Sequence, residues 1–348
     1  MTLEFFDMIA DVDITALPKW DEKTFIDKSR PVSKAIVNEY NEIRCRRYGW
    51  AGSVVAEFLH EYYEISRDSL RRMLTVSVGD DLVILLLKRV LMFDNANYLR
   101  IDGLPISVQG KEGHEQLVLD AIARNKLSPK IQVVDAERKL IESWGYTNRE
   151  GGNDTYNFVY HLPSRWDYIN RSKWRSKNGI NKVKPLIIQD CVDEKSYESM
   201  IKLTEMWSEW KDEHHGLRAK KLAKGIKEHA KKNNPVVKYY MINHVTTRYT
   251  PNIPIGFAVY ILTTNNMAHL VVNKPLAHTN FEPNDEYEES IKRYSGRLLY
   301  YHTMEELQKL GVEHVFFGGV FSQKTLAEHK KILTDDQIGS HIYRLYND

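Results

Sequence analysis

The chain has 348 residues, of which 42% are hydrophobic and 28% charged, and its formal net charge at pH 7 is +2. A chain of this length exceeds the usual size of one hydrophobic core, so we expect two domains, and the small net charge gives no general sign of a nucleic-acid partner. No apolar run approaches the roughly 20 residues that span a bilayer, the first residues lack the pattern of a signal peptide, and the two cysteines lack metal-site spacing. These features predict a cytoplasmic protein with no membrane partner.

Helical and strand patterns alternate along the first half of the chain. Helices are predicted where apolar residues recur at helical spacing, and strands where β-branched and aromatic residues run together. The predicted elements are, in order, helices at 33–48 and 53–73, strands at 82–93 and 98–106, a helix at 113–124, a strand at 131–134, a helix at 136–144 and a strand at 156–161.

The second half begins with two helices and then changes to strands after Pro235. A four-residue turn at 263–266 joins two of these strands as a hairpin. The predicted elements are helices at 196–211 and 217–232, strands at 236–244, 255–262 and 267–272, a helix at 295–310 ended by Gly311, a strand at 312–317, a helix at 325–333 and a strand at 341–346.

The two halves show a similar order of elements, and their back halves match one by one. This match predicts an α/β (α+β) protein built by an internal duplication with a period of roughly 170–180 residues. The alternative is that any α/β protein alternates helices and strands in this way.

Two segments carry a resemblance to a known superfamily. Residues 144–190 contain a glycine–aromatic pair, a strand ending in a Leu-Pro step and then a basic helix, and residues 295–319 read SGRLLYYHTMEELQKLGVEHVFFGG. Both segments resemble tandem GNAT acyltransferases, and the first resembles the junction between the halves of Fem-type (FemA/FemX-like) aminoacyltransferases. The resemblance implies two tandem GNAT-like domains, 1–163 and 164–348, each a mixed, mostly antiparallel sheet flanked by helices. It implies a catalytic second domain and a first domain that is structural or binds substrate.

The resemblance leaves the acyl donor open. GNAT enzymes that use acetyl-CoA place a glycine-rich loop at a helix N-terminus, where backbone N–H groups meet the pyrophosphate. The corresponding residues here, 293–297, contain the single glycine Gly296. Fem-type proteins also lack the full loop, and the donor in that family is an aminoacyl-tRNA. We therefore expect either acyl-CoA or aminoacyl-tRNA as donor, and no tightly bound cofactor.

Candidate catalytic residues follow from the place where a GNAT-like sheet opens. We expect this opening between the strands at 255–262 and 313–318, facing the start of the helix at 295. Acyl transfer needs a proton path and a donor to the oxyanion. The candidates are, for catalysis, His269, Asn273 and Tyr300, and for donor binding, Ser295, Gly296, Arg297, Gly318 and Gly319. His269 in an apolar strand also fits a core histidine, Arg297 a solvent-facing side chain, and the two glycines a tight turn.

A basic run from Arg165 to Lys184 holds seven basic residues and one acid, interleaved with aromatic residues. Lysine and arginine bind phosphates and aromatic rings stack on bases, so this run is a candidate nucleic-acid or acceptor surface, although solvated helix faces are also basic. The candidate residues are Arg171, Lys173, Trp174, Arg175 and Lys177. The adjacent His214 and His215 lack metal-ligand spacing, so we predict no metal site.

These features predict an enzyme that transfers an acyl or aminoacyl group to an amine on a small molecule or macromolecule, with tRNA or DNA as a candidate partner. One alternative is an acyltransferase that modifies DNA or RNA bases with acyl-CoA. Another is a nucleic-acid-binding protein that keeps the fold without the chemistry.

Overall fold

The structure is a computed structural model of the chain. It describes residues 10–52, 59–66, 71–91, 97–150, 155–182, 185–189, 194–211, 213–232, 234–244, 254–263, 266–320 and 336–346.

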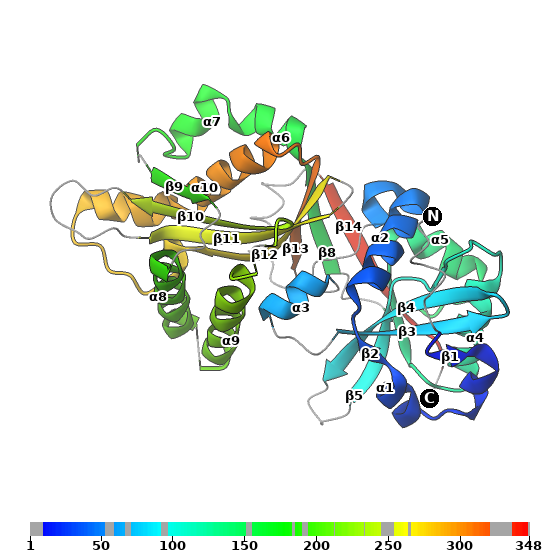
Figure 1. Cartoon of the computed structure of the whole chain (residues 1–348). Helices are drawn as coiled ribbons and strands as arrows, with labels where there is room; N and C mark the ends of the chain where they lie inside the picture. Colours follow the sequence, from blue (N-terminus) through cyan, green and yellow to red (C-terminus); the bar gives the residue numbers. More distant parts are fainter. Residues whose placement is uncertain are drawn as a thin grey trace.

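The first half of the chain supplies a group of strands covered by short helices (Figure 1). In chain order its elements are β1 (Val12–Asp13), η2 (Ile14–Lys19), α1 (Glu22–Lys28), β2 (Arg30–Pro31), α2 (Lys34–Tyr48), η3 (Gly49–Gly52), α3 (His60–Ser66), β3 (Arg71–Val78), β4 (Asp81–Leu91), β5 (Asn97–Asp102), β6 (Ile106–Ser107), α4 (His114–Arg124), β7 (Lys130–Val134), α5 (Asp135–Ser143) and β8 (Thr155–His161).

The second half begins with helices and carries the longest helix described, α10. Its elements are α6 (Leu162–Ile169), α7 (Ser172–Lys177), β9 (Pro185–Gln189), α8 (Glu194–Lys211), α9 (Glu213–Ala230), β10 (Val237–His244), β11 (Pro254–Thr263), β12 (Met267–Pro275), η5 (Leu276–His278), α10 (Glu286–Lys309), β13 (His314–Val320) and β14 (Asp336–Arg344).

All described strands join one 14-stranded sheet, whose order shows the duplication. From one edge the order is β1-β3-β4-β5-β7-β14, and it continues β8-β13-β12-β11-β10-β9. The order β3-β4-β5-β7 is therefore mirrored by β10-β11-β12-β13, and we call these halves the first and second unit. The last strand of each half is exchanged: β8 pairs with β13 and β14 pairs with β7, both antiparallel. The boundary between residues 163 and 164 stays a prediction.

Helices cover both faces of the second unit (Figure 1). On one face, Tyr260 of β11 contacts Thr303 of α10, with 3.3 Å between their hydroxyl oxygens. On the other face, the ammonium of Lys274 in β12 lies 3.0 Å from the ring centroid of Trp207 in α8. Because side chains alternate along a strand, α10 and α8 pack against opposite faces of the sheet.

The structure corrects three predicted elements. The helix predicted at 53–73 extends too far, because Arg71 begins β3, which pairs antiparallel with β4. The last strand begins at Asp336, earlier than the predicted residue 341. The third correction, the start of α10, concerns the site and is described below. The helix predicted at 325–333 lies outside the described residues.

Candidate active site

The strands β12 and β13 separate in the middle of the second unit. They are parallel and pair at three positions, Met267 with His314, Ala268 with Val315 and His269 with Phe316. Beyond His269, β12 continues to pair with β11 as far as Pro275, while β13 continues along β8. A V-shaped opening therefore lies between β12 and β13. It was predicted between the strands at 255–262 and 313–318, but β12 lies between those two strands.

Both arms of the opening carry a β-bulge. Val259 of β11 pairs with Val272 of β12, and the next residue, Tyr260, pairs with Leu270. Val271 of β12 is therefore the extra residue of a bulge. In β13 the register shifts between Phe316 and Gly319, which sets Gly318 and Gly319 on the other arm. Bulges recur beside active sites because they redirect backbone groups out of the ladder. No described strand pairs with the open edge of β12 beyond His269, so its backbone N–H groups there can bind a substrate oxygen.

His269 lies where the two strands part, but it is a core residue. Its side chain is fully buried, and its ring stacks on Phe316 with centroids 4.8 Å apart and planes 12° apart. Burial lowers the pKa of His269 to about 3, so the imidazole is neutral at pH 7. A base with so low a pKa accepts a proton poorly, which does not favour the predicted catalytic role.

Asn273 lies on the open arm of β12 and has an unused hydrogen-bond acceptor. The bulge at Val271 moves Asn273 to the α10 face of the sheet, opposite to His269, because Asn273 pairs with Ala258 and His269 with Ile261. The residue is partly exposed, yet its Oδ1 is buried and accepts no hydrogen bond within the described residues. Buried acceptors are normally satisfied, so Oδ1 is a candidate partner for a substrate N–H group.

Tyr300 is a packing residue in this structure. Its ring is 3% exposed and meets Tyr160 and Phe317 edge to face, with centroids 6.0 Å away in each case. Nε of the buried Arg165 donates a 3.2 Å hydrogen bond to its hydroxyl oxygen. Burial and the neighbouring Tyr300 raise the pKa of the Tyr160 hydroxyl well above its ordinary value. Tyr160 therefore stays protonated, and its contact with Tyr300 joins α10 to the sheet.

Ser295, Gly296 and Arg297 lie in the middle of α10 and not at a helix start. The helix begins at Glu286, capped by the Asp285 side chain, which accepts a hydrogen bond from the Glu288 N–H. The predicted start at 295 is wrong because Glu286, Glu288 and Glu289 form an acidic first turn, which favours a helix start but has no apolar periodicity. The backbone N–H groups of 295–297 belong to the helix interior and are not free to bind a phosphate.

The side chains of these three residues have different surroundings. Ser295 is buried, where its hydroxyl accepts a 2.8 Å hydrogen bond from the Ala277 N–H and donates one to the Lys292 carbonyl. Gly296 faces Pro275 at ordinary contact distance, and Arg297 is exposed. Of the three, Arg297 alone offers a charged group to a ligand.

The basic helix α7 packs on α10 through an aromatic contact. The ring of Trp174 stacks on Tyr301 with centroids 6.3 Å apart and planes 21° apart, so one face of this ring is used. Arg175 is half-buried beside Tyr301, which leaves Arg171, Lys173 and Lys177 as the exposed cations.

The basic run also has an exposed aromatic ring, that of Tyr168 in α6, the helix before α7. It is 47% exposed and lies near the guanidinium groups of Arg165 and Arg171, which are 5.1 Å and 5.8 Å from its centroid. Tyr168 was not among the candidate residues, because the packing of Trp174 against α10 is a long-range contact that the residue order does not show.

The equivalent opening of the first unit is filled by its own residues. There β5 and β7 pair at Ile101 with Ile131 and Asp102 with Gln132, and the chain then turns away. Leu104, fully buried, donates its N–H to Glu137 Oε1 and accepts a hydrogen bond from Tyr40.

A buried ion pair lies beside Leu104 in this opening. Arg44, 4% exposed, donates to the fully buried Glu137, and burial raises the pKa of Tyr40 beside them. Arg44 lies in α2 and Glu137 in α5, so no local pattern of residues predicts that the two charges pair. The corresponding residues of the second unit, Leu270, Val271 and Asn273, remain partly exposed.

Within the described residues there is no cluster of three or more metal-ligating side chains. None of the helices there is both long and apolar enough to cross a membrane.

No family model matches the sequence, and no curated protein matches it. Solved structures do resemble the chain. FemX superposes with a TM-score of 0.53 at 8% identity, over 86% of this chain and 95% of FemX. The chain has the tandem GNAT fold. Two such GNAT-like units, each a mostly antiparallel sheet flanked by helices, confirm the predicted fold class.

Two further solved structures resemble the fold of this chain. A conserved protein of unknown function from Bacteroides thetaiotaomicron has a TM-score of 0.61 at 10% identity, over 91% of this chain and 98% of that one. The C-terminal domain of a protein named as a lysylphosphatidylglycerol synthetase from Agrobacterium fabrum has a TM-score of 0.50 at 9% identity. The match covers 90% of this chain and 92% of that one. At these identities the likeness concerns the fold.

Proposed function

We propose that this protein transfers an aminoacyl group from an aminoacyl-tRNA to an amine, at the opening between β12 and β13. The observation that carries the proposal is that Asn273 Oδ1, on the open arm of β12, is buried and has no hydrogen-bond partner among the described residues. An amine has N–H groups to donate to this oxygen, and such a hydrogen bond orients its lone pair toward an acyl carbon.

The open edge of β12 supplies hydrogen-bond donors for the oxyanion that forms during the transfer. When the amine attacks the ester carbonyl, negative charge develops on the carbonyl oxygen, and backbone N–H groups beyond His269 are available to stabilise it. The C–N bond then replaces the ester C–O bond. The proton that leaves the amine goes to the released ribose hydroxyl through water, so the products are an amide and a free tRNA.

Charge favours tRNA over CoA as the donor. The first turn of α10 contains Glu286, Glu288 and Glu289, and its cap is already occupied by the Asp285 side chain, so this helix start repels a pyrophosphate. The exposed cations of α7 lie beside the middle of α10, where they suit an RNA backbone. The resemblance to Fem-type proteins implies the same donor.

The second unit is the catalytic unit in this proposal. Its opening keeps partly exposed residues, whereas Leu104, Arg44 and Glu137 fill the first. This difference supports a structural role for the opening of the first unit.

The test is a transfer assay with two donors. Purified protein is mixed with a charged total tRNA preparation or with acetyl-CoA, each with a panel of amines that includes amino sugars, diamines and peptides. Amide products are measured by mass spectrometry. We expect product from aminoacyl-tRNA, a fall in rate of about 10²-fold for Asn273→Ala, and no change for the exposed Lys139→Gln in α5.

Other outcomes assign the function differently. Product from acetyl-CoA alone contradicts the tRNA donor but keeps the opening as the site if Asn273→Ala lowers the rate. Tight tRNA binding with no product from either donor contradicts the enzyme and favours a binding protein.

A further inference from the structure

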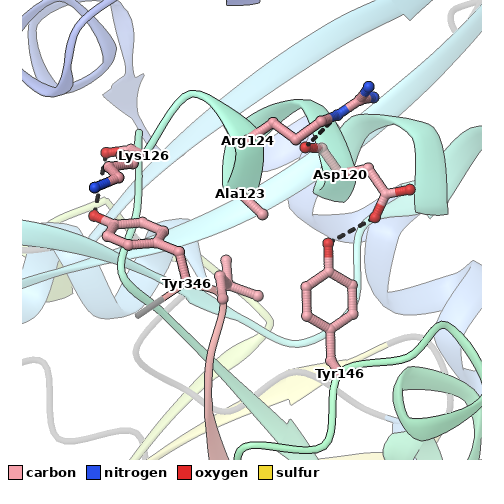
Figure 2. A pocket seen from close by; sticks show the side chains of 7 residues that line it. Asp120, Ala123, Arg124, Lys126, Tyr146 and Tyr346 are labelled. Atoms are coloured by element: carbon pink, nitrogen blue, oxygen red, sulfur yellow. Dashed lines mark hydrogen bonds between the residues drawn. The ribbon is translucent and has the colours of Figure 1, made fainter. Parts of the chain in front are cut away.

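A pocket of about 640 Å³ lies in the first unit, where the C-terminal segment passes the end of α4 (Figure 2). Ala123 of α4 and Leu345, which follows β14, supply apolar side chains to its lining. The rings of Tyr146 and Tyr346 flank the pocket. This combination of apolar side chains and two aromatic rings suits a flat ring system.

One carboxylate faces the aromatic side of the pocket. The Tyr146 hydroxyl donates a 2.7 Å hydrogen bond to Asp120 Oδ1, and burial together with this contact raises the pKa of Tyr146. Within the described residues no hydrogen bond uses Asp120 Oδ2. The pocket therefore has an acceptor for an N–H group on the edge of a ring.

Two cations complete the lining. Arg124 is exposed, and its Nε donates to the Asp120 backbone oxygen, while the ammonium of Lys126 lies 5.7 Å from the Tyr346 ring centroid. Neither forms an ion pair within the described residues, so both charges are available to an anion. The two cations exceed the single carboxylate, which favours a ligand with more than one negative charge.

Lys126 holds a backbone conformation that costs free energy. Its φ is +52°, in the left-handed region that favours glycine. It closes α4 in a Schellman motif, in which its N–H bonds the Ala123 carbonyl and the Leu127 N–H bonds the Ile122 carbonyl. Glycine is the usual residue at this position, so the helix end does not require a lysine side chain.

We infer that this pocket binds a nucleoside monophosphate whose base carries an exocyclic amino group. The base lies against Tyr146 and Tyr346, its amino group donates to Asp120, and its phosphate, which carries nearly two negative charges at pH 7, meets Arg124 and Lys126. The site is separate from the opening between β12 and β13. Because Leu345 and Tyr346 follow the exchanged strand β14, a bound nucleotide also holds that strand in the first unit.

The test compares four probes by isothermal titration calorimetry: AMP, UMP, adenosine and inorganic phosphate. We expect AMP to bind more tightly than each of the others. UMP lacks the exocyclic amino group, adenosine lacks the phosphate, and inorganic phosphate lacks the base. Inorganic phosphate binding as tightly as AMP contradicts the aromatic part of the site. No heat of binding for AMP at millimolar concentration overturns the proposal.

The Lys126→Gly variant separates binding from folding. Glycine suits the left-handed conformation, so the variant should melt at the same temperature or higher, while its Kd for AMP rises about tenfold through loss of a charge-assisted contact. Lys139→Gln, outside the pocket, should leave the Kd unchanged. A Lys126→Gly variant that binds AMP as the parent does contradicts the assignment.

Amide hydrogen exchange gives a second readout. AMP should slow exchange at residues 340–346 and leave β12 unchanged. Slower exchange in β12 alone would place the nucleotide in the opening and overturn the separate site.

Discussion

His269 and Phe316 form the last cross-strand pair between β12 and β13, and their stacked rings close the narrow end of the opening. Burial lowers the pKa of His269 to about 3, below the ordinary value of 6.5. The unfolded chain therefore takes up a proton that the folded protein does not as the pH falls below 6.5. The contribution of His269 to stability is complete above pH 6.5 and is lost between pH 6.5 and about 3.

The variant His269→Phe keeps an aromatic ring against Phe316 and removes this titration. Between pH 7.5 and pH 5 the parent should lose about 2 kcal/mol more unfolding free energy than the variant does. Urea unfolding at the two pH values measures the difference. Burial also lowers the pKa of His314, but that histidine is present in both proteins. Equal losses in parent and variant would show that His269 is not a buried neutral histidine.

Gly225 of α9 touches the backbone of α3, and a Cβ there would overlap the Ile65 carbonyl oxygen. Alanine normally stabilises a helix interior by about 1 kcal/mol relative to glycine, yet Gly225→Ala should destabilise the protein by about 2 kcal/mol through overpacking. Gly296 of α10 is the matched control, because a Cβ there meets Pro275 at 3.7 Å and Gly296→Ala should stabilise. Thermal unfolding of both variants tests this, and a stabilising Gly225→Ala would contradict the packing of α3 on α9.

Arg44 and Glu137 are expected to be coupled. Arg44→Met leaves the buried Glu137 carboxylate without its cation, which should cost about 3 kcal/mol of unfolding free energy. The double variant Arg44→Met/Glu137→Gln removes that charge and should recover part of the loss. Arg138→Gln, in an exposed pair with Glu142, is the control and should have little effect. Additive losses in the double variant would argue against a buried pair.

The exposed cations of α7 should dominate any binding of tRNA. The triple variant Arg171→Gln/Lys173→Gln/Lys177→Gln should bind more weakly and reduce the slope of log K against log salt concentration by about 2 to 3. Fluorescence anisotropy with labelled tRNA at several salt concentrations measures the slope. The control variant Lys23→Gln/Lys28→Gln/Lys139→Gln removes the same number of positive charges from the first half of the chain. Equal slopes for the two triple variants would exclude α7 as the RNA contact.

The order of elements in the second unit was largely predictable, because apolar periodicity and turn residues are local signals. β10, β11, β12 and α8 lie close to their predicted ranges. β3 was missed because no glycine or proline separates Arg71–Val78 from the helical pattern before it. α10 starts before its prediction because Asp285 and the acids after it form a cap and first turn that the apolar pattern does not mark.

The site was less predictable, because it depends on strand register. His269 and Asn273 are four residues apart and share a face in a regular strand. A one-residue bulge at Val271 puts them on opposite faces, and nothing in the residue types requires that bulge. The exchange of β8 and β14 is likewise a long-range pairing, and so is the Arg44–Glu137 pair that fills the first opening.

The most direct measurement of the central claim is amide hydrogen exchange with aminoacyl-tRNA present and absent. If transfer occurs at the opening between β12 and β13, exchange should slow at residues 270–274 on the open edge of β12. It should stay unchanged at 103–107, the filled opening of the first unit. Unchanged exchange at 270–274 together with slower exchange at 103–107 would contradict the account.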